Sequence, residues 1–313
     1  MAPIRVGLIG LSAKSRSGWA AAAHLPYLLS PRGKERYQIV AVLGSTTERA
    51  RESVEHFSLP NPDSIRTYGA PEELAADPNV DLVVCSVRVD KHYDTVRPSV
   101  AAGKDVIVEW PLAEDTLRAK ELADLSKKAG GRTAVVAQAR LAPYFVKLKE
   151  LLADGTIGKV INSQVNSNAT EEGQDSVFRG MESFGDPKSG ASFYAIFFGH
   201  TWDPIQYVLG DAKDPGFVWT IRGEKGSLRL TYEGRYVNQG DGALIEWHDR
   251  ATGETRPVEW QWQEWQAGHP GPVRNVAALY EVFADGDESK YVTFDVALKR
   301  HEQLDSIREN SSK

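Results

Sequence analysis

Two side chains in the apolar stretch at residues 190–210 have the chemistry of a general acid or base. An imidazole ordinarily titrates near neutrality, so His200 can give or take a proton at physiological pH. Tyr194 lies six residues earlier, which does not place it on quite the same face of a helix. Both residues also suit structural roles, as a hydrogen-bonded histidine and a core aromatic. The sequence predicts His200 as a catalytic residue, with Tyr194 as a substitute proton donor.

A loop rich in serine follows the first apolar run, "IRVGLI". Gly10 ends that run and Gly18 opens the next helix, as expected where backbone must approach a pyrophosphate at a helix N-terminus. Ser12 stands where the dinucleotide fingerprint has a second glycine, and the loop is longer than usual, so an ordinary βα loop is the alternative. The residues predicted to contact a dinucleotide here are Gly10, Leu11, Ser12, Ser17, Gly18 and Trp19.

The second apolar run ends in "VAVLGSTTERAR" rather than in an acidic residue. An NAD site usually places Asp or Glu at this position, where the carboxylate holds the ribose diol. Hydroxyl groups with an arginine nearby are better suited to a 2′-phosphate. Ser45, Thr46 and Arg49 therefore predict NADP(H) as the preferred cofactor, with NAD(H) as the alternative.

Composition narrows the class of protein. The chain has 313 residues, a net charge of -6 and one cysteine, Cys85. An acidic chain without a basic patch is not expected to bind nucleic acid directly, and one cysteine leaves no internal disulfide. The histidines show no metal-ligand spacing, so no metal is expected. With no leader-like start and no membrane-spanning run, we expect a cytoplasmic protein, or a nuclear one if it is regulatory.

Continuous apolar runs alternate with amphipathic stretches in the first part of the chain. The expected strands are residues 4–9, 37–43, 80–87, 105–110 and 132–139. Unbroken apolar strands that alternate with helices predict a parallel sheet covered by helices on both faces. The expected fold class is α/β, a doubly wound Rossmann domain.

The pattern changes after about residue 140. An amphipathic helix is expected at 141–158, and later alternating runs meet at the hairpin signals "GEKG" and "RATGE". This predicts a C-terminal α+β domain with a mostly antiparallel open sheet. We expect a dinucleotide-binding domain at 1–138 and a substrate and dimerisation domain at 139–313. The tryptophan-rich stretch at 259–271 predicts a strand that buries one aromatic face, or alternatively an aromatic wall for a sugar or peptide.

Several stretches together resemble one family in order and spacing. They are "IRVGLIG", "LVVCSVRVDKHYDTVRPSVAAGKDVIVEWPLA", "AQARLAPYFVKLKELLADGTIGKV" and "SGASFYAIFFGHTWDPIQYVLG". They resemble the glucose–fructose oxidoreductase/inositol dehydrogenase (Gfo/Idh/MocA) family, and within it the branch of the fungal galactose-regulon repressor. The resemblance covers most of the chain, from about residue 3 to residue 211, together with the hairpin "FVWTIRGEKGSLRL" and the C-terminal helix. It implies a nicotinamide cofactor, a substrate between two domains, and an open sheet that often forms a homodimer.

The resemblance also assigns residues to the site, with departures. Dehydrogenases of the family carry Glu-Lys-Pro after the fifth strand, and here Glu109, Trp110 and Pro111 match, so tryptophan replaces a lysine that touches the nicotinamide. His92 matches a histidine near the nicotinamide. Ile196 replaces an aspartate that precedes the histidine matched by His200. The other residues predicted to contact the cofactor lie near the ends of strands: Ser86, Val87, Arg88 and Gln138.

The chain continues differently from the family after Gly210. Only "DAKDP" separates that glycine from the hairpin that starts at Phe217, where the family has several more strands. Either the second sheet is shortened or residues are missing, and the dimerising face is in doubt.

Three functions follow from these observations. The first is an NADP-preferring oxidoreductase that transfers hydride to or from a sugar, polyol or related carbonyl compound. The second is a catalytically inactive, cofactor-binding regulator that binds a protein partner, which the replacements at Trp110 and Ile196 favour. The third is a scaffold with an empty pocket.

Overall fold

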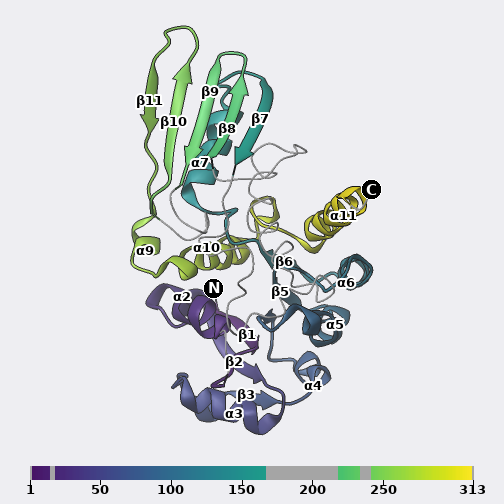
Figure 1. Ribbon diagram of the computed structural model, residues 1–313. Coiled ribbons are helices and arrows are strands. Elements are labelled where there is room, and N and C mark those ends of the chain that lie inside the picture. Colours follow the sequence, from purple (N-terminus) through teal and green to yellow (C-terminus); the bar gives the residue numbers. More distant parts are fainter. Residues whose placement is uncertain (1, 15–17, 167–217, 233–240, 312–313) are drawn as a thin grey trace, which may run out of the picture. The chain divides into compact units, whose positions relative to one another are not determined.

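The chain folds into two compact units in a computed structural model, which describes residues 2–14, 18–166, 218–232 and 241–311 (Figure 1). The first unit contains the chain up to Val136 and the chain from Leu279. The described residues from Ala137 to Ala278 form the second unit. The sequence-based division assigned the segment from Leu279 to the second domain, and its packing, given below, explains the difference. A domain boundary at residue 138 stays a prediction.

Six parallel strands form the sheet of the first unit, which confirms the expected Rossmann architecture. They are β1 (Ile4–Ile9), β2 (Tyr37–Leu43), β3 (Arg66–Tyr68), β4 (Leu82–Cys85), β5 (Asp105–Glu109) and β6 (Thr133–Val136). Their order is β3-β2-β1-β4-β5-β6, so the sequence order reverses between β1 and β4. In open α/β sheets a ligand binds beyond the carboxyl ends of the strands at such a switch point.

The helices of this unit begin and end where local chemistry requires. Up to residue 136 the α-helices are α1 (Leu25–Leu28), α2 (Pro31–Arg36), α3 (Thr47–His56), α4 (Pro71–Ala76), α5 (His92–Ala101) and α6 (Thr116–Ala129). For example, α6 starts at Asp115, whose side chain accepts from the Arg118 amide at 2.8 Å, and ends at Gly130 with φ +84°. The helix expected to open at Gly18 is instead a π-helical turn at Ala20–His24 followed by α1.

The C-terminal segment packs on the Rossmann sheet. It includes the end of α10 (Gly271–Asp285) and all of α11 (Phe294–Ser311). Phe294 is fully buried, and the Val135 amide of β6 donates to the Val292 carbonyl at 2.6 Å. The helices α4, α5, α6 and α11 lie side by side (Figure 1). These contacts place the segment in the first unit.

A five-stranded antiparallel sheet forms the second unit, as the hairpin signals predicted. Its strands are β7 (Val160–Asn166), β8 (Val218–Gly223), β9 (Gly226–Thr231), β10 (Leu244–Asp249) and β11 (Thr255–Val258), in the order β11-β10-β9-β8-β7. α7 (Pro143–Ala153) contributes Phe145, whose ring lies 6.3 Å from that of Trp219. Residues 259–263 form no strand, and α9 (Glu264–Ala267) follows. Trp260 and Trp262 instead pack around Tyr144, at 5.0 and 6.2 Å between ring centroids.

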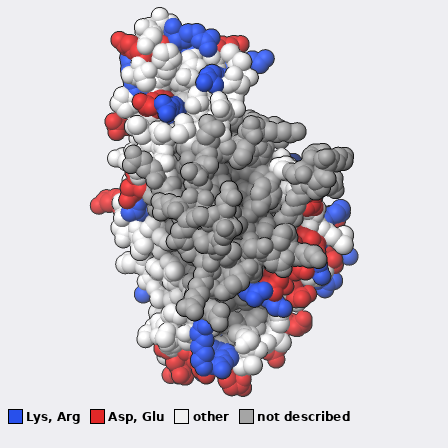
Figure 2. All heavy atoms as spheres, in the orientation of Figure 1, with Lys and Arg blue, Asp and Glu red and all other residues white. Residues whose placement is uncertain are grey.

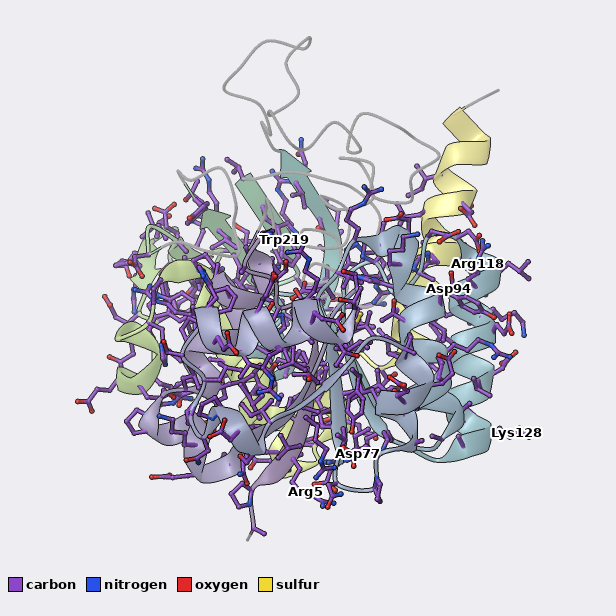
Figure 3. The ribbon with its side chains drawn as sticks, turned by 90° about the horizontal axis from the view of Figure 1, so that it is seen from below. Arg5, Asp77, Asp94, Arg118, Lys128 and Trp219 are labelled. Atoms are coloured by element: carbon purple, nitrogen blue, oxygen red, sulfur yellow. The ribbon has the colours of Figure 1, made fainter. Side chains whose placement is uncertain are left out.

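An ion pair joins the amino ends of β1 and β4, the ends of these strands that lie away from the switch point. Arg5, at the start of β1, donates to Asp81, just before β4, with a shortest contact of 2.6 Å. Figure 3 shows Arg5 and Asp77 on this side of the unit, with Asp94 and Arg118 on α5 and α6. The amino ends of β1 and β4 are therefore held to each other. Among the described residues no helix is long and apolar enough to span a bilayer.

Candidate cofactor site

The first feature of the site is the close approach of two backbone segments at the switch point. Gly10 directly follows β1 and has φ +97°, a conformation that side chains rarely adopt. A Cβ built on Gly10 would lie 2.2 Å from the Ser86 carbonyl oxygen, just after β4. The Ser86 amide in turn donates to the Ile9 carbonyl at 3.0 Å. Only glycine fits this position, as the dinucleotide interpretation of Gly10 requires.

The loop after Gly10 divides into buried and accessible parts. Leu11 is buried, whereas Ser12 is exposed and its hydroxyl accepts from the Lys14 amide at 3.2 Å. Gly18 has φ +56°, and a Cβ there would meet nothing within 4 Å. The polar groups of Ser12 are thus available to a phosphate, whereas Leu11 forms part of the core. Ser17 lies outside the described residues.

The end of β2 presents the polar residues from which NADP was predicted. Ser45, Thr46 and Arg49 are all exposed, and Thr46 caps α3 by accepting from the Arg49 amide at 3.2 Å. The Arg49 guanidinium contacts Glu52 at 2.6 Å, and both side chains are about half exposed. Exposed pairs of this kind contribute about 0–1 kcal/mol, so Arg49 can exchange partners readily.

A buried histidine supports the loop after β4. His92 is almost fully buried, with Nδ1 2.8 Å from the Pro111 carbonyl and Nε2 3.0 Å from the Val87 carbonyl. Burial lowers the pKa of His92, against the opposing effect of these two carbonyls. His92 therefore holds the loops after β4 and β5 together. Arg88 is exposed and pairs with Asp90 at 3.0 Å.

Two buried side chains at the end of β4, Ser86 and Cys85, differ in their chemical capacity. The Ser86 hydroxyl is buried and has no hydrogen-bond partner among the described residues. Cys85 is completely buried, and burial raises the pKa of its thiol to about 12. A thiol with this pKa stays protonated near neutrality, so Cys85 is not a nucleophile.

The end of β5 carries the residues that match the family's Glu-Lys-Pro. Glu109 is buried, and its Oε1 accepts from Trp19 Nε1 at 3.0 Å and lies 2.7 Å from His24 Nε2. Trp110 is 4% exposed and its ring lies 5.3 Å from that of His301 on α11. The tryptophan is thus part of the packed interior of this unit.

Sequence reasoning missed His24 as a member of the site. The side chain is completely buried and connects Glu109 to the Tyr280 hydroxyl, which lies 2.9 Å from His24 Nδ1. One signal was present, because His24 ends the run "WAAAAH", where a polar side chain among alanines needs a buried partner. Tyr280 gave no such signal, since it is one aromatic residue in an amphipathic helix.

Several predicted residues are not brought together by the described structure. The catalytic candidates His200 and Tyr194, and Ile196, lie outside the described residues. Gln138 is buried and belongs to the second unit. Within the described part of the chain, no group of three His, Cys, Asp or Glu side chains could hold a metal ion.

The residues at the switch point fit a dinucleotide. Gly10 allows close approach of a ligand, the Ser86 hydroxyl has hydrogen-bonding capacity to spare, and Glu109 Oε2 takes no hydrogen bond from a described residue. Residues that would hold the cofactor in this fold come from the ends of β1, β2, β4 and β5: Gly10, Ser12, Ser45, Thr46, Arg49, Ser86 and Glu109. On the face shown in Figure 2, acidic and basic side chains are interspersed over the described surface.

Comparisons with known proteins agree with this fold. Residues 4–137 match the Gfo/Idh/MocA family, described as an oxidoreductase family with an NAD-binding Rossmann fold. Residues 143–215 match the C-terminal domain of Gal80p.

Relatives of both kinds are similar to the chain. A dehydrogenase, aclE, of Aspergillus oryzae is 34% identical over 66% of this chain and 55% of its own length. The galactose/lactose metabolism regulatory protein GAL80 of Kluyveromyces lactis is 31% identical over 66% of this chain and 46% of its own length. The chain thus spans about half the length of these two relatives.

Solved structures share the fold. The transcriptional regulator Gal80p from Kluyveromyces lactis has a TM-score of 0.82 at 22% identity, covering 99% of this chain and 93% of that one. An inositol dehydrogenase homologue complexed with NAD+ from Azotobacter vinelandii has a TM-score of 0.71 at 14% identity, covering 97% and 94%.

Proposed function

We propose that this chain is an NADP-preferring oxidoreductase. The match of residues 4–137 to the Gfo/Idh/MocA oxidoreductase family, with its NAD-binding Rossmann fold, and the match of residues 143–215 to the C-terminal domain of Gal80p support this proposal. The substrate would be a sugar, a polyol or a related carbonyl compound. The observation that supports this most directly is the approach of Gly10 to the Ser86 carbonyl at the β1–β4 switch point. That geometry leaves the backbone of the loop open to a pyrophosphate.

The cofactor and the protein would contribute different steps to the reaction, hydride transfer and proton transfer. A bound nicotinamide supplies the hydride donor or acceptor, which no side chain can provide. The protein must then supply a proton partner for the substrate oxygen, and His200 is the residue we propose for this role, with Tyr194 as the substitute. Trp110, at the position of the family's lysine, carries no mobile proton, so the proton must come from elsewhere.

The His200→Ala variant tests the enzymatic role. If His200 is the general acid or base, turnover in a screen of sugars and polyols with NADPH or NADP+ should fall about 100-fold or more, because proton transfer contributes that much. Cofactor affinity, measured by calorimetry, should change little. His248→Ala is the matched control, since His248 lies on β10 and contacts Thr255 at 3.1 Å. Undiminished turnover in His200→Ala would contradict the assignment.

A regulatory protein is the second candidate, and the packing of Trp110 favours it. The residue at the lysine position is 4% exposed and lies against His301, so it is built into the interior instead of serving a substrate. In this account the chain binds NADP(H) and a regulatory protein, as the similarity to GAL80 suggests. The two candidates differ in the same experiment. A regulator shows no turnover in the wild type, and its His200→Ala variant loses binding of the partner.

We also propose that the phosphate of NADP(H) is held at the start of α3. Ser45 and Thr46 offer hydroxyl groups there, the helix N-terminus favours an anion, and Arg49 is free to leave its exposed pair with Glu52. An arginine can contact a phosphate through two parallel hydrogen bonds.

Exchange of Arg49 should therefore abolish the preference for NADPH over NADH. In Arg49→Gln we expect NADPH affinity to fall about tenfold, because one charge-assisted contact is lost, while NADH affinity stays unchanged. Calorimetric titration of both cofactors measures the effect. The control is Arg51→Gln, since Arg51 donates to the Pro62 and Ile65 carbonyls instead. Equal losses for the two cofactors in Arg49→Gln would show that Arg49 does not contact the phosphate.

A further inference from the structure

A buried chain of hydrogen bonds ends at the candidate cofactor site. Glu109, the last residue of β5, accepts from Trp19 Nε1 at 3.0 Å and lies 2.7 Å from His24 Nε2, both through Oε1. His24 Nδ1 lies 2.9 Å from the hydroxyl of Tyr280 on α10. His24 is completely buried and Tyr280 nearly so, whereas the Glu109 side chain keeps 9% of its surface exposed. These four residues are called the Glu109 chain below.

The protons in the Glu109 chain have one arrangement that satisfies every buried group. Burial raises the pKa of Tyr280 well above its ordinary value, so the phenol keeps its proton. Its hydroxyl has no other acceptor among the described residues, so it donates to His24 Nδ1. His24 then carries its own proton on Nε2 and donates it to Glu109. A neutral imidazole results.

In this arrangement the Glu109 carboxylate is held in a fixed position, and its charge is not cancelled by His24. Both donors on Oε1, the indole N–H of Trp19 and the imidazole N–H of His24, are neutral groups, and each makes a charge-assisted hydrogen bond to an ionised carboxylate. The charge is therefore held in place without being cancelled by either donor. Glu109 Oε2 takes no hydrogen bond from a described residue.

The position of this charge in the fold determines which part of a bound dinucleotide it would meet. In a doubly wound sheet of this order the pyrophosphate lies at the end of β1 and the adenosine ribose at the end of β2. The nicotinamide half of a dinucleotide then extends over the other half of the sheet, which begins with β4 and β5. The oxidised nicotinamide ring carries a positive charge, and the reduced ring is neutral. Glu109 thus interacts differently with the two redox states.

We propose that the Glu109 chain makes the site prefer the oxidised over the reduced nicotinamide cofactor, with His24 and Tyr280 as positioning residues that hold the Glu109 carboxylate. The proposal rests on the proposed cofactor binding. It predicts a selectivity between redox states, which the proposed oxidoreductase or regulator function does not require. For a regulator this selectivity is a means to report the redox state of the cofactor pool.

The test measures dissociation constants of NADP+ and NADPH by calorimetry, without any turnover. In Glu109→Gln, which keeps the shape and the acceptor oxygen, we expect NADP+ affinity to fall about tenfold further than NADPH affinity, as for loss of one unit charge in a partly buried site. His24→Leu should shift the ratio of the two constants in the same direction. His24→Gln should restore it, because the amide N–H can still donate to Glu109.

Tyr27→Phe is the matched control for the positioning role. Tyr27 stacks on Tyr280 at 5.4 Å, but its hydroxyl donates to Glu281. Removing this hydroxyl should alter stability and leave the ratio of dissociation constants at the wild-type value. If Glu109→Gln does not fold, Tyr280→Phe, which removes one oxygen atom, provides the same comparison.

The outcomes separate the two proposals. If neither cofactor binds the wild type, the proposed function is wrong, and the redox preference falls with it. If both cofactors bind and Glu109→Gln changes both affinities equally, or neither, cofactor binding stands and the redox preference is overturned. A shift of the ratio in Tyr27→Phe as large as in Tyr280→Phe would show that the effect is general softening of the aromatic cluster.

Discussion

The Gly10→Ala variant should lose both cofactor binding and stability. The added Cβ would lie 2.2 Å from the Ser86 carbonyl oxygen, and φ at this position is +97°. The clashing atom belongs to the backbone, which cannot change rotamer as a flexible side chain can. The segments that follow β1 and β4 must therefore move apart locally. We expect a loss of about 3 kcal/mol in the free energy of unfolding, the sum of left-handed strain and overpacking. Urea unfolding measures the stability, and calorimetry with NADPH measures the binding.

Gly130→Ala provides the control for left-handed strain alone. Gly130 has φ +84° at the end of α6 in the same unit, and a Cβ there would meet nothing within 4 Å. This variant should lose about 1 kcal/mol and bind cofactor as the wild type does. A Gly10→Ala variant that binds NADPH normally would show that the close approach at the switch point has no part in cofactor binding.

Glu281→Ala should be the most destabilising change away from the site. The Glu281 side chain is 10% exposed and accepts from Arg32 at 2.7 Å, from Arg36 at 2.7 Å and from the Tyr27 hydroxyl. Removing the carboxylate leaves these donors without their acceptor. We expect a loss of about 3 kcal/mol, because breaking a buried pair by removal of one partner is costly. The control Asp285→Asn, an exposed partner of the same Arg36, should cost less than about 1 kcal/mol.

The effect of Glu281 should also depend on pH. Burial by itself would raise the pKa of Glu281, but hydrogen bonds from Arg32 and Tyr27 and the charges of Arg32 and Arg36 lower it below its ordinary value of 4.5. A carboxyl whose pKa is lower in the folded state stabilises fully above the unfolded pKa and loses this contribution as pH falls. The stability difference between wild type and Glu281→Ala should therefore shrink below pH 4.5. A difference that grows on acidification would contradict this assignment.

The sequence was sufficient for five of the six strands of the Rossmann sheet, because these strands are apolar and regularly spaced. The runs at β1, β2 and β5 identify themselves by continuous apolar residues. β3 has three half-buried residues, Arg66–Tyr68, too few and too polar for a pattern. The π-helical turn at Ala20–His24 was also missed, because hydrophobic periodicity cannot distinguish it from one turn of α-helix.

The backbone geometry at the candidate site was predictable at Gly10, where only glycine fits. Gly10 was identified from its place after β1, and its geometry follows from the absence of a side chain. The partners of Glu109 could not be found this way, because His24 and Tyr280 are 85 and 256 residues apart from their respective contacts along the chain. Only the fold brings such distant positions together. The same holds for Trp110 and His301, whose contact joins the loop after β5 to α11.

The central claim is that this chain binds a nicotinamide dinucleotide and prefers NADP(H). Calorimetric titration of the wild-type protein with NADPH and with NADH tests it most directly. We expect saturable binding of one cofactor per chain, with a dissociation constant for NADPH about tenfold below that for NADH. Absence of binding for both cofactors at concentrations of about 1 mM would contradict the claim and leave a protein partner as the ligand to seek.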